Sequence, residues 1–230
     1  MSTVNRSRRE TPPPSRLAAL LSAGLLVLGG SIVLAQEIGS PSGEPAAGKL
    51  LVASRGLLEP NFDRTVVLLV NHSDEGAMGI IINRPTEVRL GELVSDLEGV
   101  EEREETVWVG GPVAHWQMVL LIRSKKVPEG AENVFENVHF SASRVVLDQL
   151  LAKDTEFRVY AGYAGWTAGQ LEHEIARGGW HVLPGEPELI FDPAPLELWR
   201  ELIVRGEAKW VYRPRPSRVA EWKEAGRLSQ

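Results

Sequence analysis

The sequence predicts one α+β (mixed α/β) domain at residues 49–212. Two observations indicate this class: apolar runs of strand length recur along the region, and segments with helical periodicity interrupt them at irregular intervals. The regular alternation of strands and helices that is typical of a parallel sheet does not occur in the pattern. The chain has 230 residues, 43% of them hydrophobic, which suffices for one domain with a full core. We therefore expect a single compact domain in which helices flank a sheet.

Six runs rich in Val, Leu and Ile are predicted to be strands, at residues 49–54, 65–70, 77–83, 106–111, 117–124 and 156–163. The segment between the second and third runs predicts a hairpin turn, since Asp74 favours turn initiation and Gly76 tolerates a positive φ. His72, Ser73 and Asp74 are adjacent in this segment. Because a hydrolase triad normally draws its members from separate segments, we interpret these residues as part of the turn.

Four segments have apolar residues at helical spacing, at residues 90–97, 142–152, 167–177 and 195–205. Ser141 or Ser143 lies near the start of the second predicted helix, where a hydroxyl can cap free N–H groups. Pro195 suits the first turn of the fourth, since its fixed φ matches the helix.

The third predicted helix follows the glycine-rich stretch AGYAGWTAG at residues 161–169. A dinucleotide-binding loop needs a different glycine spacing and a P-loop needs a following lysine, so no phosphate site is predicted here. Thr167 and Gln170 have the spacing of a capping box, and Trp166 and Leu171 occupy the positions of a hydrophobic staple. We interpret the stretch as the architecture of a helix start.

Two further groups of residues leave alternatives open. Glu172 and His173 are candidate acid/base groups, but a solvent-facing side of the helix is the interpretation that we favour. Gly110 and Gly111 precede Pro112, and adjacent glycines permit either a close approach to a ligand or a tight bend between strands. The five histidines show no metal-ligand spacing, so neither a metal nor a cofactor site is predicted.

The termini are predicted to differ from the domain. Residues 1–35 combine four arginines with an uncharged apolar run at 17–35, which is typical of a secretory signal peptide or an uncleaved signal anchor. Residues 36–48 are rich in Gly, Pro, Ser and Ala and predict a flexible tether, and residues 213–230 form a polar tail. Either form of the signal places the domain outside the cytoplasm, in the periplasm or anchored to the membrane and facing away from the cytoplasm.

The charge of the exported part argues against a nucleic-acid partner. The whole chain carries −6, and residues 1–35 carry four Arg and one Glu, or +3, so the remainder carries −6 − 3 = −9. Binding to nucleic acid requires a basic face, which an acidic domain is poorly suited to supply. The absence of cysteine also excludes disulfides, thiol nucleophiles and thiolate metal sites.

Three motifs in order resemble the YqgE/AlgH family: NFDRTVVLLVNHSDEGAMGIIINRP, then GGPV, then AGWTAGQLEHEI. The resemblance covers residues 50–205 and implies a compact α/β domain whose mixed sheet curls into a pseudo-barrel. Some members are labelled transcriptional regulators, but the resemblance implies no agreed activity or catalytic residue. Many members have Cys-Glu-His where this chain has Val70, Asn71 and His72, so a role of that Cys or Glu cannot apply here.

We therefore expect an exported, non-enzymatic binding or regulatory protein of the cell envelope, with an unknown protein or small molecule as its partner. Contact with a membrane is expected only through residues 17–35, if they are uncleaved. The alternative is a hydrolase or other small-molecule enzyme that uses His72 with Asp74, or Glu172 with His173, as acid/base groups. The candidate surface of the family motifs comprises His72, Asn83, Arg84, Gly110, Gly111, Trp166, Gln170 and Glu172.

Overall fold

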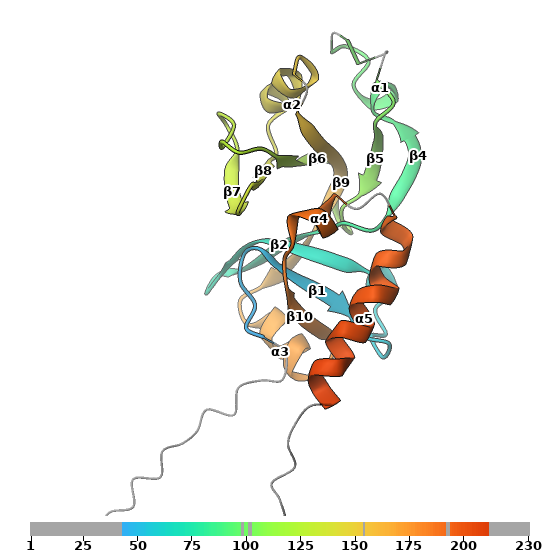
Figure 1. Cartoon of the computed structure of the whole chain (residues 1–230), viewed down its shortest axis with the longest axis vertical. Coiled ribbons are helices and arrows are strands. Elements are labelled where there is room, and N and C mark those ends of the chain that lie inside the picture. Colours follow the sequence, from blue (N-terminus) through green and yellow to red (C-terminus); the bar gives the residue numbers. More distant parts are fainter. Residues whose placement is uncertain (1–42, 98, 101–102, 154, 192–193, 212–230) are drawn as a thin grey trace, which may run out of the picture. The chain divides into compact units, whose positions relative to one another are not determined.

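A computed structural model describes residues 43–211 apart from 98, 101, 102, 154, 192 and 193 (Figure 1). The predicted signal at 1–35, most of the tether and the tail at 213–230 lie outside the described residues. The predicted fold class is confirmed, because the domain consists of a curled mixed sheet with flanking helices. None of the helices in the described part of the chain has the length and apolar character needed to cross a membrane.

Ten strands make up the sheet: β1 Lys49–Ala53, β2 Val66–Ser73, β3 Gly76–Ile81, β4 Pro85–Arg89, β5 Thr106–Val109, β6 Val113–Arg123, β7 Glu132–Phe135, β8 Val138–Ser141, β9 Glu156–Thr167 and β10 Trp180–Pro184. The helices are α1 Leu90–Leu93, α2 Arg144–Leu151, α3 Gln170–Ala176, α4 Pro187–Ile190 and α5 Pro195–Val211, with a 3-10 turn at Pro60–Phe62.

The long strand β9 connects the two halves of the sheet. Its first half pairs with β6 on one side and, in parallel, with β5 on the other, and its last residues pair with β3. The main order is β10-β1-β2-β3-β9-β6-β8-β7, and β4 joins through β5. The pairing of β5 with β9 makes the sheet mixed, since the other pairs are antiparallel.

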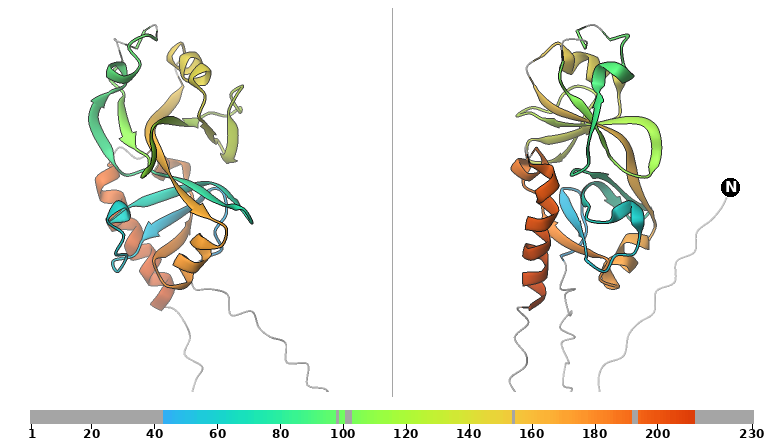
Figure 2. Two further views of the ribbon diagram at one scale, coloured as in Figure 1. Left: turned by 180° about the vertical axis from the view of Figure 1, so that it is seen from behind. Right: turned by 90° about the vertical axis from the view of Figure 1, so that its right-hand side faces the viewer.

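Both faces of the β10-β1-β2-β3 portion are covered, which explains its unbroken apolar runs. Alternate residues such as Leu50 and Leu68 pack toward α4 and α5, while their neighbours Leu51 and Val67 pack toward α3. Figures 1 and 2 show α5 lying across one face of β1 and β10. A third cluster packs α1 and α2 against β5, β6 and β9.

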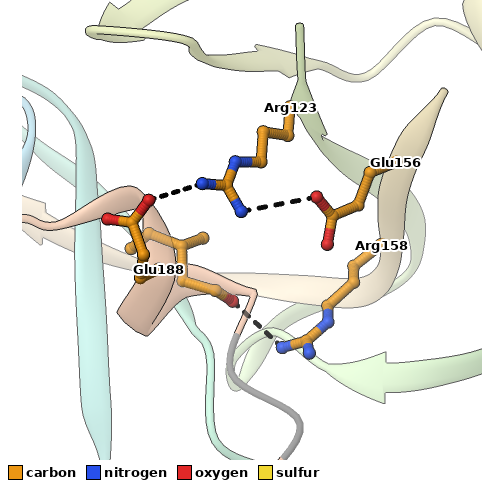
Figure 3. A network of polar contacts seen from close by, with 5 residues as sticks. Arg123, Glu156, Arg158 and Glu188 are labelled. Carbon is orange, nitrogen blue, oxygen red and sulfur yellow. Dashed lines mark hydrogen bonds and ion pairs between the residues drawn. The ribbon is translucent and has the colours of Figure 1, made fainter.

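Ion pairs and a hydrogen bond connect α4 to the strands β6 and β9 (Figure 3). The guanidinium of Arg123 lies 2.5 Å from Glu188 on α4 and 3.5 Å from Glu156 on β9. Arg158 donates a hydrogen bond of 3.0 Å to the carbonyl of Ile190 and stacks over the ring of Trp108. These contacts hold α4 against the two strands.

Several predicted elements are confirmed and others differ. All six predicted strands form, and the segment after β2 makes the predicted turn into β3. The helix predicted at 90–97 is shorter, because α1 ends at Leu93, although Val94 and Leu97 still pack into the core beside it. The pattern missed the strands β4, β7, β8 and β10.

The predicted start of the third helix is wrong by two residues. Strand β9 continues through Thr167, which still pairs with Gly76, and α3 begins only after Gly169, whose φ of 72° is left-handed. Half of the predicted capping box exists, since the N–H of Thr167 donates to Gln170 Oε1 at 3.1 Å. The hydroxyl of Thr167 also donates to Gln170, so it does not cap the helix. The turn from strand to helix thus depends on a glycine backbone.

Candidate functional site

A cavity of about 640 Å³ opens between the segment that links β1 to β2 and the helix α3. This volume falls within the range of small-molecule sites, and polar and apolar groups share its lining. We call it the α3 pocket and define it by its lining residues: Ser54, Gly56, Leu57, Leu58, Glu59, Asn61, Phe62, Pro112, Gly165, Trp166, Gln170, Glu174, Arg177, Gly178 and Gly179.

Two predicted candidates, Asn83 and Arg84, hold one wall of this pocket in place. The buried amide of Asn83 accepts the N–H of Val66 at 2.9 Å and donates to the carbonyl of Arg64 at 2.9 Å. Arg84 donates to the carbonyls of Asn61 at 2.8 Å and of Asp63 at 3.2 Å. Both side chains therefore position the segment before β2 and do not line the pocket.

The chemistry of the other wall centres on Glu174, a half-buried carboxylate of α3. Its Oε2 accepts hydrogen bonds from the indole Nε1 of Trp166 at 3.0 Å and of Trp180 at 2.9 Å. Its Oε1 accepts one from the side-chain amide of Gln170 at 3.0 Å. Three neutral donors from separate positions thus fix the carboxylate at the pocket wall.

The rings behind Glu174 form a closed aromatic core. The centroids of Phe62 and Trp166 lie 6.0 Å apart with the rings stacked, and that of Trp180 lies 5.4 Å from Phe62. Trp166 is 6% exposed and packs with Leu171, so its predicted packing role is confirmed. Phe62 and Trp166 line the α3 pocket, and Trp180 packs behind them.

The candidates His72 and Glu172 meet outside the α3 pocket. His72 Nε2 on β2 lies 2.6 Å from Glu172 Oε1 at the start of α3, and the two side chains are 22% and 47% exposed. The hydrogen bond from His72 holds the pKa of Glu172 below its ordinary value. The predicted pairings of His72 with Asp74 and of Glu172 with His173 are not found in the described contacts, since Asp74 stays in the exposed turn after β2.

Gly110 and Gly111 belong to a buried bend between β5 and β6, so their place on a candidate surface is wrong. A Cβ at Gly110 would lie 2.3 Å from the carbonyl oxygen of Gly162, and one at Gly111 would lie 2.1 Å from the backbone of Tyr163. The bend crosses β9 so closely that a side chain has no space. Of the two alternatives left open by the sequence, the tight bend is the one that forms.

The sequence reasoning missed Glu174 and the whole segment between β1 and β2. Gln170 and Glu174 are four residues apart on one helix, a spacing that brings side chains together and that could have indicated the pair. The segment at 54–62 has no such periodicity, and it forms one wall of the α3 pocket only in the folded protein. Among the described residues, no group of three His, Asp or Glu lies close enough to hold a metal ion.

Comparisons with known proteins agree with the fold and the motifs. Residues 50–210 match the AlgH-like family. A UPF0301 protein of Streptomyces avermitilis is 40% identical over 164 residues, which cover 69% of this chain and 85% of that protein. A UPF0301 protein of Chlorobium luteolum is 36% identical over 162 residues, covering 69% and 84%. The names of these relatives assign no activity.

Two solved structures are also similar to this chain. The solution structure of the AlgH protein from Pseudomonas aeruginosa is similar with a TM-score of 0.60 and 29% identity, over 70% of this chain and 87% of that one. A crystal structure of a protein from Corynebacterium diphtheriae matches with a TM-score of 0.60 over 76% and 91% of the two chains. Its identity of 22% makes this second likeness one of fold alone.

Proposed function

The chain belongs to the AlgH-like family, and from this premise we propose that it is an exported, non-enzymatic binding or regulatory protein of the cell envelope that takes its ligand in the α3 pocket. One observation carries the proposal: the rigidly held carboxylate of Glu174 lines a cavity of ligand size beside apolar groups. A few fixed polar groups in a partly apolar cavity are typical of a small-molecule site.

The export half of the proposal rests on the sequence. A basic segment followed by an uncharged apolar run at 17–35 is typical of a secretory signal. Cell fractionation with an antibody to the native protein tests it. We expect the protein in the envelope or periplasmic fraction, and recovery wholly in the cytoplasm would contradict export.

A thermal-shift screen of the purified full chain against a small-molecule library tests the binding half. A compound that binds only the folded state raises the melting temperature, by an amount set by its concentration and Kd. Gly165→Leu is the blocking variant, because Gly165 lines the pocket and a Cβ there would contact no atom closer than 3.5 Å. Gly43→Leu is the matched control, since Gly43 is outside the pocket and a Cβ there would also be free of clashes.

We expect at least one compound to stabilise the parent and the Gly43→Leu control but not Gly165→Leu. A complete absence of stabilising compounds, or hits that Gly165→Leu leaves unchanged, would contradict the assignment of the pocket.

The pair of His72 and Glu172 supports a second candidate function, a hydrolase, since the two groups are within hydrogen-bond distance. Two observations disfavour it. The pair is partly exposed and outside the α3 pocket, and the lowered pKa of Glu172 moves that carboxyl further from neutral pH, where a general base works best. A panel of ester and amide substrates tests it: turnover by the parent that His72→Ala abolishes would establish the second candidate.

A further inference from the structure

We propose that the α3 pocket binds a zwitterionic amino-carboxylate with an apolar side chain, such as a free aromatic amino acid. The ammonium group pairs with Glu174, the carboxylate pairs with Arg177, and the apolar side chain lies against the rings and aliphatic groups of the pocket. The inference rests on the proposed function, since it names the ligand class of the same site.

The hydrogen bonds and the charge of the Glu174 carboxylate favour a cationic ligand group. A carboxylate can accept about four hydrogen bonds, and three neutral N–H groups occupy both of its oxygens while leaving an acceptor site on Oε1. Among the ion pairs of the described residues, none includes Glu174. The three neutral donors stabilise the carboxylate but leave its negative charge without a counter-charge, which a ligand ammonium in the pocket supplies.

Arg177 supplies the complementary charge three residues further along. It is the C-cap residue of α3, its exposed side chain lines the same pocket, and the described contacts include no ion pair or hydrogen bond of its guanidinium. Residues three apart on a helix lie about 5–6 Å apart at Cβ. A ligand whose ammonium and carboxylate share one carbon atom can therefore reach both side chains, and Arg binds a carboxylate through two parallel hydrogen bonds.

The remaining lining selects for an apolar body and against a simple anion. Leu57, Phe62, Pro112 and Trp166 present apolar surface to the cavity. Besides Glu174 and Arg177, its charged lining residue is Glu59, so the lining carries two negative charges and one positive charge. A ligand that carried only a carboxylate would face this net negative charge, whereas a zwitterion satisfies both signs.

Isothermal titration calorimetry of the full chain with three probes that share one phenyl ring and its two-carbon chain tests the ligand class. The probes are phenylalanine, phenethylamine without the carboxylate, and 3-phenylpropanoate without the ammonium. We expect phenylalanine to bind at least about tenfold tighter than either of the others, because only phenylalanine engages both charges. Binding of phenethylamine or 3-phenylpropanoate as tight as that of phenylalanine would overturn the proposal.

Variants separate the two contacts. Glu174→Gln should reduce phenylalanine affinity at least about tenfold, and Arg177→Gln should bring it to the level of phenethylamine. Glu172→Gln, on the outside of the same helix, is the matched control and should bind like the parent. Since Glu174→Gln also alters the contacts of two Trp rings, the Arg177→Gln result is decisive if the first variant proves poorly folded: unchanged phenylalanine binding by Arg177→Gln would overturn the proposal.

The outcomes also distinguish this proposal from the one it rests on. One outcome is that none of the three probes binds, while a library compound binds the parent but not Gly165→Leu. The proposed ligand class would then be wrong, and the α3 pocket would still be the binding site. If nothing binds in a manner sensitive to Gly165→Leu, both proposals are wrong.

Discussion

Glu174 is the residue on which both the packing of α3 and the proposed site depend. Its carboxylate joins Trp166 of β9 and Trp180 of β10 to the helix that carries it. Hydrogen bonds to a charged acceptor are stronger than those to a neutral one. Glu174→Gln keeps the size of the side chain but removes the charge.

We expect Glu174→Gln to lower the free energy of unfolding by about 1–2 kcal/mol, measured by denaturant unfolding. Glu172→Gln is the control and should change it by less than about 0.5 kcal/mol, because its ion pair with His72 is partly exposed to solvent. Equal and small effects of both substitutions would show that the indole contacts contribute little.

Two glycines show that residue type alone does not reveal whether the fold requires a glycine at a given position. Gly111 and Gly165 both belong to the family motifs, yet a Cβ at Gly111 would overlap the backbone of Tyr163 at 2.1 Å, and one at Gly165 would make ordinary contacts. Gly111→Ala should therefore destabilise the protein by more than about 3 kcal/mol or prevent folding, while Gly165→Ala should be within about 0.5 kcal/mol of the parent. A well-folded Gly111→Ala protein in a thermal melt would contradict the close crossing of β5–β6 over β9.

At the scale of elements, the start of α3 is the clearest difference between expectation and structure. The capping-box pattern predicted Thr167 as the cap, whereas the backbone turns at Gly169 with a φ of 72°. Gly169→Ala should cost about 1 kcal/mol, because a side chain disfavours the left-handed conformation. Thr167→Ala should cost less than about 0.5 kcal/mol in the same denaturant experiment, and the reverse order of the two would support the cap predicted from the sequence.

The packing of α5 on β10 predicts a dependence of stability on pH. His181 of β10 is buried where Gly206 brings α5 close, and this burial lowers the pKa of His181, an effect that Glu207 partly opposes. Because the folded state then binds a proton less readily than the unfolded state, stability is fully present above the unfolded pKa of about 6.5 and declines as pH falls below it. The parent should lose more unfolding free energy between pH 7.5 and 5.5 than His181→Gln does, and identical pH slopes would contradict this account.

The elements that the sequence predicted are those with a strong local pattern. The runs that became β1, β2 and β3 are apolar on both sides because helices cover both faces of that part of the sheet. The strands β4 and β7 were missed because none of their residues is buried and both include charged residues, so their pairing with β5 and β8 is a tertiary property. Strand β9 was predicted to end four residues early, since the glycines at 162 and 165 concealed its continuation.

The site is less predictable than the fold for a related reason. Of the motif residues, Trp166 and Gln170 line the α3 pocket, whereas Asn83 and Arg84 hydrogen-bond the backbone of the segment before β2. The carboxylate of Glu174 is held at the pocket wall partly by Trp180, which β10 places beside it only in the folded protein. These relations join residues distant in sequence, which local spacing cannot reveal.

For the molecule as a whole, we expect the ligand to bind beside Glu174 and not elsewhere on the domain. The seven tryptophans of the chain include reporters in different places: Trp166 and Trp180 donate to Glu174, whereas Trp116 is 87% exposed on β6. The most direct test is an NMR titration of the ¹⁵N-labelled full chain with the tightest compound from the screen. We predict that the indole N–H signals of Trp166 and Trp180 shift together to saturation while that of Trp116 stays in place. A shift of the Trp116 signal without shifts of Trp166 and Trp180 would place the ligand elsewhere on the domain.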